Sequence, residues 1–228
     1  MIDTKKMCAA GAVVAMCAGA ASASFTVTPQ SAMSGFGTNF NGTVGTGIAN
    51  SNVNVASSDT LDVEIGLKAD LRFTANLPSV GNRYDAPLGT TAGPPMGATW
   101  NYVAVVDLGS GTLNDYQVNL RLDFDPAAGA SNFATIDYNL AAVAAGGPTA
   151  LNTGVFGDSQ NPLFSFWQTL LGAPAFDPNA PGEYEVELEV LDGAGGTVAL
   201  SQIVVRVPAP GSAALLAGGL VVAGRRRR

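Results

Sequence analysis

The sequence predicts an all-β protein, built as an antiparallel β-sandwich. Three observations support this fold class. Apolar and polar residues alternate with a period of two in several stretches, turn-forming residues separate these stretches, and no stretch sustains the 3.6-residue repeat of an amphipathic helix. The predicted sandwich spans residues 59–207, and segments of different character flank it on both sides.

The first segment, residues 1–23, has the three parts of a secretory signal peptide. Lys5 and Lys6 precede an apolar stretch over residues 7–20, and a triplet of small residues follows it. A basic start, a short apolar stretch and a small-residue site are what signal peptidase recognises. The predicted cleavage site consists of Ala21, Ala23 and Ser24, with cleavage after Ala23.

Both cysteines of the chain, Cys8 and Cys17, lie in this segment, so cleavage after Ala23 leaves a chain without cysteine. A disulfide framework and thiol chemistry are therefore excluded from the mature body. A second interpretation stays open for Cys17, which could be the lipidated residue of a lipoprotein signal. Met16 before it is larger than the small residue expected there.

The charge of the chain is unevenly distributed. Residues 24–210 contain 5 of the 11 basic residues and 17 of the 18 acidic residues, which gives a net charge of −12. An acidic body argues against binding to nucleic acid and against docking on an anionic membrane surface. The body is long enough to bury a core and is expected to form one domain.

Residues 24–58 form a Gly/Ser/Asn-rich segment with scattered apolar residues. This composition is typical of a flexible surface segment or a long edge loop, with room for an edge strand.

The strongest strand pattern follows, over residues 61–75, where every odd position is apolar from Leu61 to Ala75. The even positions include Lys68, Asp70 and Arg72. Period two over fifteen residues predicts a half-buried strand, or two strands bent at Gly66, with the odd face on a core and the even face in water.

Other stretches predict further strands. Residues 116–124 and 184–190 alternate in the same way, whereas residues 100–108 and 198–207 are apolar on both faces and are expected to be central strands. Residues 133–140 are a weaker candidate. The stretch 161–172 fits a short helix or a strand, and its aromatic residues are expected to fill the end of the core.

The last predicted hairpin, residues 181–207, starts with Pro181-Gly182 and Tyr184. This stretch resembles the final hairpin of PKD-like and other immunoglobulin-like modules. The resemblance implies an immunoglobulin-like sandwich in which the tyrosine forms a corner hydrogen bond with the backbone. It implies no ligand, because such folds carry many functions.

The chain ends in a tripartite tail, residues 208–228. Its sequence motif consists of Pro208, Ala209 and Pro210, an apolar run over residues 211–224, and the cluster Arg225, Arg226, Arg227 and Arg228. As a helix the apolar run would span about 21 Å, which is less than the hydrocarbon core of about 30 Å. The basic cluster beside it would stay cytoplasmic, which leaves the body on the outer side.

This tail resembles the sorting tail of PEP-CTERM proteins, which are substrates of exosortases in diderm bacteria. The resemblance implies a transmembrane sorting helix, transient anchoring in the inner membrane, removal of the tail near the prolines by an exosortase-type membrane enzyme, and release to the cell surface or extracellular matrix. Ala209 stands where the family has glutamate. The alternative is a simple C-terminal membrane anchor.

The residue types of the body exclude several reaction classes. The chain has no histidine, which removes the Ser-His-acid triad and imidazole metal sites. Asp123 and Asp125 are weak candidates for a Ca²⁺ site, and turn capping before Pro126 is the alternative. The row Glu183, Glu185, Glu187 and Glu189 is expected to be a solvated face. Two facing carboxylates could also hydrolyse a glycoside.

The sequence therefore predicts a secreted, non-enzymatic protein of the cell surface or extracellular matrix, with a structural or adhesive role and exopolysaccharide as a possible contact. No cofactor is expected, apart from the weak Ca²⁺ site. The alternative is a carbohydrate-binding or Ca²⁺-binding module. Exposed aromatic side chains would favour sugar binding, and the candidates are Trp100, Tyr102, Tyr138 and Trp167.

Overall fold

The computed structural model describes residues 24–31, 52–74, 76–93, 95–129 and 132–209. The predicted signal peptide, with Ala21 and Ala23, lies outside the described residues. Pro210 and the cluster from Arg225 to Arg228 also lie outside them, so the predictions on these residues stay predictions.

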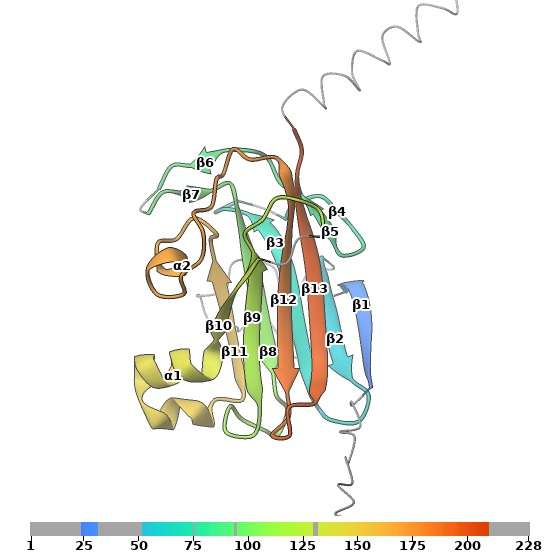
Figure 1. The fold of residues 1–228 in the computed structure, drawn as a ribbon. Helices are drawn as coiled ribbons and strands as arrows, with labels where there is room; N and C mark the ends of the chain where they lie inside the picture. The colour runs from blue at the N-terminus through green and yellow to red at the C-terminus, as the bar shows by residue number, and fades with distance from the viewer. Residues whose placement is uncertain (1–23, 32–51, 75, 94, 130–131, 210–228) are drawn as a thin grey trace, which may run out of the picture.

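Two β-sheets lie face to face in the described part of the chain (Figure 1). The order of the first sheet is β1 (Phe25–Ser31), β2 (Val53–Ser58), β3 (Glu64–Leu71), β8 (Trp100–Asp107) and β11 (Val155–Gln160). The order of the second is β10 (Phe133–Asp137), β9 (Gln117–Asp123), β12 (Gly182–Leu191), β13 (Thr197–Val207), β5 (Arg83–Asp85) and β4 (Ser79–Val80). A separate ribbon joins β6 (Thr90–Thr91) and β7 (Gly97–Ala98).

Strands pair antiparallel throughout the described sheets, except that β5 runs parallel to β13 over three residue pairs. The all-β class and the antiparallel sheets are thus confirmed. The connection from β10 to β11 contains α1 (Tyr138–Gly146) and a 3₁₀ turn, η1 (Pro148–Asn152). With α2 (Phe166–Thr169), α1 lies at the molecule's β10/β11 edge, while β1 forms the opposite edge (Figure 1).

The core lies between the two sheets and is filled by alternate residues of their strands. Leu67 and Ala69 of β3 belong to this core together with Val186 and Ile203 of the second sheet. Trp167 of α2 is fully buried at one end of the core, where its ring lies 5.4 Å from Phe124. The predicted role of the aromatic stretch is confirmed, and its central part is a helix.

Most predicted strands are present, with the expected burial. β9 and β12 bury every second residue, and β8 is buried on both faces. β13 is central, as expected, but it buries only one face along most of its length. The candidate over residues 133–140 is a strand only as far as Asp137, and α1 begins at Tyr138.

The first sheet includes part of the Gly/Ser/Asn-rich segment. β1 and β2 both lie within residues 24–58, so the sandwich starts well before the boundary expected at residue 59. β1 is an edge strand.

The even face of β3 is not in water, and the prediction for this face is wrong. Lys68, Asp70 and Arg72 are all buried. The neighbouring strand shows that this outer face of the sheet is covered as a whole, so burial is not special to β3. Lys68 lies opposite Val103 of β8, which is also buried and lies outside the core between the sheets. The first sheet is therefore covered on both faces at this point.

None of the helices in the described residues has the length and apolar character needed to cross a bilayer. The apolar run of the tail lies outside those residues, so the predicted sorting helix stays a prediction.

Candidate functional site

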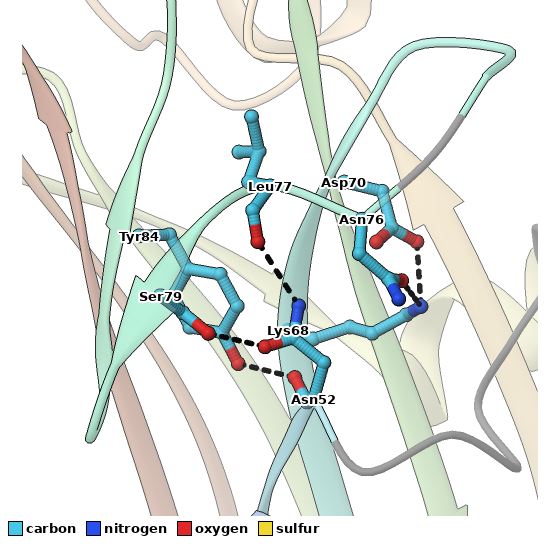
Figure 2. A network of polar contacts seen from close by, with 7 residues as sticks. All are labelled: Asn52, Lys68, Asp70, Asn76, Leu77, Ser79 and Tyr84. Atoms are coloured by element: carbon cyan, nitrogen blue, oxygen red, sulfur yellow. Dashed lines mark hydrogen bonds and ion pairs between the residues drawn. The ribbon is translucent and has the colours of Figure 1, made fainter.

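Lys68 is the centre of a buried polar cluster at the end of β3 (Figure 2). Its side chain is 0% exposed, and its Nζ lies 2.7 Å from Oδ2 of Asp70 and 3.2 Å from Oδ1 of Asn76. Lys68 and Asp70 share a face because they are two residues apart on one strand. The chain then turns back at Phe73, whose φ is 67°, and Asn76 pairs antiparallel with Asp70.

The ion pair in this cluster is costly to bury. Burial raises the pKa of Asp70, and the charge and hydrogen bond of Lys68 oppose that rise. Oδ1 of Asp70 meets no hydrogen-bond partner among the residues described. Taking two charges out of water costs several kcal/mol for each ion, and close pairing recovers only part of this. Burial of the Lys68–Asp70 ion pair is thus costly for stability, which makes the cluster a candidate functional site.

A second set of hydrogen bonds fixes the segment that carries Asn76 (Figure 2). The hydroxyl of Tyr84 donates to the backbone oxygen of Asn52 at 2.6 Å. Nδ2 of Asn52 donates to the backbone oxygen of Leu77 at 3.3 Å, and its Oδ1 accepts from the hydroxyl of Ser79. Leu77 follows Asn76 directly, so these bonds hold the carboxamide of Asn76 in place.

The charge on Asp70 also influences Tyr84. Burial is the main cause that raises the pKa of Tyr84, and the nearby charge of Asp70 adds to it. Tyr84 is therefore a neutral hydrogen-bond donor at any physiological pH. The cluster brings an amine, a carboxyl group and a carboxamide together at the border of the interior, where Lys68 and Asp70 are buried and Asn76 is exposed.

Arg72, two residues beyond Asp70, is held in a different way. Its guanidinium carbon lies 4.6 Å from the ring centroid of Phe73 and 5.2 Å from that of Phe164. Nη2 donates to the backbone oxygen of Pro95 at 2.5 Å, whereas Nε and Nη1 are buried without a partner among the described residues. Burial lowers the pKa of Arg72. The two rings supply cation–π attraction where the described chain offers no carboxylate.

A second candidate site is an open, largely apolar cavity of about 380 Å³ between α1, η1 and β11. Leu113, Ala142 and Phe156 contribute to its walls. Tyr138 and Asp158 also line it, and the hydroxyl of Tyr138 donates to Oδ2 of Asp158 at 3.1 Å, while Nε2 of Gln160 donates to Oδ1 of Asp158 at 2.7 Å. Burial raises the pKa of Asp158, which the two hydrogen bonds oppose. This cavity could hold a small apolar molecule.

The predicted Ca²⁺ candidates act as loop caps. Oδ1 of Asp123 accepts hydrogen bonds from the backbone N–H groups of Asp125 at 2.9 Å and Asn132 at 3.2 Å. Oδ1 of Asp125 accepts from the N–H group of Ala127 at 2.9 Å. These contacts follow the turn-capping interpretation. In the described part of the chain, no group of three or more acidic residues is placed to hold a metal ion.

The glutamate row on β12 is not a fully solvated face, because arginines neutralise most of it. Arg121 on β9 lies 3.0 Å from Glu187 and 3.2 Å from Glu189. Arg83 on β5 lies 2.5 Å from Glu183. Glu185 has a raised pKa, for which partial burial is the main cause and the charge of Glu187 the next. The row therefore links three strands of the second sheet, as well as keeping it polar.

The aromatic side chains that could have stacked on a sugar are all inside the protein. Trp100, Tyr102, Tyr138 and Trp167 are between 0% and 8% exposed. They cannot form a surface row, so the observation that would have favoured sugar binding is absent for these four residues.

The described ends of the body lie next to the predicted processing sites. Ser24 precedes β1, and its hydroxyl donates to Oδ2 of Asp59 at 2.5 Å. Pro208 and Ala209 directly follow the last residue of β13, Val207.

The sequence reasoning missed Lys68, Asp70 and Asn76 as a cluster, and it missed Asp158. A signal for the first three was present, because residues 100–108 are apolar on both faces. A strand paired with such a neighbour is covered on both faces too. Asp158 has no comparable signal, since β11 lacks a clear alternation.

Comparisons with known proteins identify no family. No family model and no curated protein matches the chain. Among solved structures, the soluble domain of PmoD from Methylocystis sp. (Rockwell) is similar over 62% of this chain and 90% of that chain, with 12% sequence identity and a TM-score of 0.29. A likeness at this level carries no argument about fold or function.

Proposed function

We propose that this protein is an exported, non-enzymatic β-sandwich that is displayed at the cell surface or in the extracellular matrix after exosortase-type processing. Its role is structural or adhesive. Its partners are the membrane processing enzyme and, after release, the exopolysaccharide of the matrix. The PEP-CTERM-like tail and the predicted signal peptide motivate the route.

The observation that carries the proposal is where the two processing sites fall relative to the sheets. β1 begins at Phe25, directly after Ser24, and β13 ends at Val207, directly before Pro208. Cleavage at the two predicted sites would thus remove no residue of any described strand. The described strands nearest to the two sites, β1 and β13, both lie between the predicted cleavage points, which supports export followed by removal of the tail.

The use of the carboxylates supports a non-enzymatic role. Asp123 and Asp125 cap a loop, and Glu183, Glu187 and Glu189 pair with arginines. Glycoside hydrolysis requires one free acid and one free carboxylate that face each other across a substrate site. Five of the six candidates from the sequence are committed to other contacts, and Glu185 lies beside Glu187 on one face of the same strand, not across a cleft from it.

The immunoglobulin-like assignment of the sandwich belongs to the same proposal. Tyr184, near the start of β12, donates its hydroxyl to the backbone oxygen of Ala180 at 3.0 Å. The resemblance of residues 181–207 implies a corner hydrogen bond from this tyrosine, and the contact with Ala180 supports it. It supports a rigid display module of the kind that surface proteins use.

The test is fractionation of the native producer, followed by the intact mass of the protein from each fraction. We expect the extracellular fraction to contain a chain that starts at Ser24 and ends close to Pro210. An intact Arg228 in the inner membrane would replace sorting by simple anchoring. A chain that starts at a lipid-modified Cys17 would replace signal peptidase cleavage by the lipoprotein route.

A pair of tail variants tests whether sorting requires the positive charge of the arginine cluster. Replacing Arg225 to Arg228 by alanine should abolish release, because the stop at the cytoplasmic face is lost. Replacing them by lysine keeps the positive charge and is the matched control. Normal release of the alanine variant would contradict the proposed role of the cluster.

A further inference from the structure

We propose that Lys68 and Asn76 become joined by an intramolecular amide bond, with Asp70 as the acid–base group. The bond would link the side chain of Lys68, on β3, to the side chain of Asn76, on the segment that turns back beside β3. The reaction requires only the folded body, so this proposal does not depend on the proposed export.

The geometry brings the reacting groups together (Figure 2). The Nζ atom of Lys68 lies 3.2 Å from Oδ1 of Asn76, which is bonded to the carbon that the amine would attack. The same Nζ lies 2.7 Å from Oδ2 of Asp70, so the proton acceptor is in direct contact with the nucleophile. Such close, fixed placement can replace much of the entropy cost of a bimolecular reaction.

The surroundings favour the uncharged reactants. Lys68 is fully buried, and burial raises the pKa of Asp70. Passing one proton from the lysine ammonium to the aspartate carboxylate removes both charges from the buried side of the cluster, while Asn76 lies on its exposed side. Desolvation disfavours the charged form of Asp70, which favours its acceptance of this proton. It yields a nucleophilic amine and a protonated carboxyl group at the place where both are needed.

The atoms of the reaction balance. The neutral Nζ of Lys68 attacks Cγ of Asn76, and protonated Asp70 donates to the developing oxyanion. One N–H proton of the amine then moves through Asp70 to the amide nitrogen of Asn76, and the bond from Cγ to this nitrogen breaks. Ammonia leaves, and a Lys–Asn amide remains. No oxidant, metal or cofactor takes part.

The hydrogen bonds around Asn52 explain how the carboxamide is held for attack. Asn52 binds the backbone oxygen of Leu77, and Tyr84 binds the backbone oxygen of Asn52. The asparagine is therefore held beside the amine by its neighbour along the chain. The product also accounts for the buried lysine, because an amide costs less to bury than an ion pair.

The test is the intact mass of the purified, folded full chain. Loss of ammonia lowers the mass by about 17 Da relative to the sequence of the chain with its observed termini. Trypsin should then fail to cleave after Lys68, and the fragment 73–83 should stay linked to the fragment that ends at Arg72. Fragmentation should place the link between Lys68 and Asn76.

Three variants assign the roles. Lys68→Met removes the nucleophile, Asn76→Ala removes the carboxamide, and Asp70→Asn keeps both reactants but removes the acid–base group. Each should recover the full mass. Asn114→Ala, at an exposed asparagine far along the chain, is the matched control and should keep the deficit of about 17 Da.

Two results would overturn the proposal. One is a folded wild-type chain with its full mass and a tryptic peptide that ends at Lys68. The other is a deficit that persists in Lys68→Met, because a succinimide formed within an asparagine also loses ammonia but needs no lysine. Because the wild-type measurement decides the matter, a variant that fails to fold does not leave the proposal untested.

Discussion

Two buried tyrosines differ in what their hydroxyl groups contact. The hydroxyl of Tyr184 donates to the backbone of Ala180, whereas that of Tyr102 is buried with no partner among the residues described. Burial, together with the charges of Asp177 and Asp125, raises the pKa of Tyr184 to about 12. Both residues are therefore neutral at physiological pH, and the hydrogen bond is the main difference between their hydroxyl groups.

This contrast predicts opposite effects of the same substitution. Tyr184→Phe should lower the free energy of unfolding by about 1 kcal/mol, because one hydrogen bond is lost. Tyr102→Phe should leave it unchanged or raise it, because an unpaired buried hydroxyl disappears. Urea unfolding of both variants measures the difference. Equal losses in the two variants would contradict the role of the corner hydrogen bond.

A second residue-scale prediction concerns Asp59 at the start of the body. Hydrogen bonds from Ser24 and then from Thr26 lower the pKa of Asp59. Cleavage after Ala23 would also place a new ammonium group on Ser24, close to this carboxylate. A lowered folded pKa contributes stability that is present above the unfolded pKa, about 3.9, and is lost as the pH falls through the folded value.

We therefore expect Asp59→Asn to lower the melting temperature of the mature chain at pH 7 and to have little effect at about pH 3. The loss at pH 7 should be small, because the group is exposed and solvent screens it. Asp62→Asn, at an exposed carboxylate nearby, is the control. An effect of Asp59→Asn that grows toward acidic pH would contradict the interpretation.

At the scale of elements, the loop from β9 to β10 depends on Asp123. Its carboxylate accepts two backbone N–H groups through Oδ1, and an asparagine can present the same acceptor. Asp123→Asn should thus keep nearly all of the stability, whereas Asp123→Ala should cost about 1 kcal/mol, since it leaves two partly buried donors without this acceptor. Thermal unfolding with and without Ca²⁺ completes the test. A rise in melting temperature with Ca²⁺ that Asp123→Asn abolishes would instead favour the metal site.

Strands whose apolar and polar residues alternate could be predicted from the sequence, whereas α1 and the shortest strands could not. β9 and β12 bury every second residue because one face lies on the core and the other meets solvent. α1 escaped the prediction because its sequence, YNLAAVAAG, is apolar all round and shows no stripe. Asp137 at its N-cap and Gly147 after its end were the available signals. β4 to β7 are two or three residues long, too short for a period to appear.

The candidate site could be predicted only in part, for a related reason. The alternation in β3 correctly assigns Leu67 and Ala69 to the core. It assigns Lys68 to water because a single strand does not reveal what covers its other face. The cluster depends on Asn76, which pairs with Asp70 only after the chain has turned back. Such a contact arises from the fold, and the local pattern does not contain it.

At the scale of the whole molecule, acidic charge opposes the folded state at neutral pH. Residues 24–210 carry a net charge of −12, and like charges repel more strongly in a compact chain. Burial also raises the pKa of Asp70, Asp158 and Glu185 in the folded protein. Each of these groups holds its proton in the folded state at a pH where the unfolded chain has lost it. Stability therefore falls as the pH rises from about 4 through the raised pKa values.

We expect a higher melting temperature at about pH 5 than at about pH 7.5, which is the reverse of what ion-paired carboxylates alone would give. The lowered pKa of Asp59 acts in the opposite direction, but that residue is exposed and its effect is small. Added NaCl at about 0.5 M should raise the melting temperature more at pH 7.5, since it screens the net charge. Asp158→Asn keeps a polar group between Tyr138 and Gln160 and should reduce the difference between the two pH values. A melting temperature that rises from pH 5 to pH 7.5 would show that the ion pairs of Arg83 and Arg121 outweigh the buried acids.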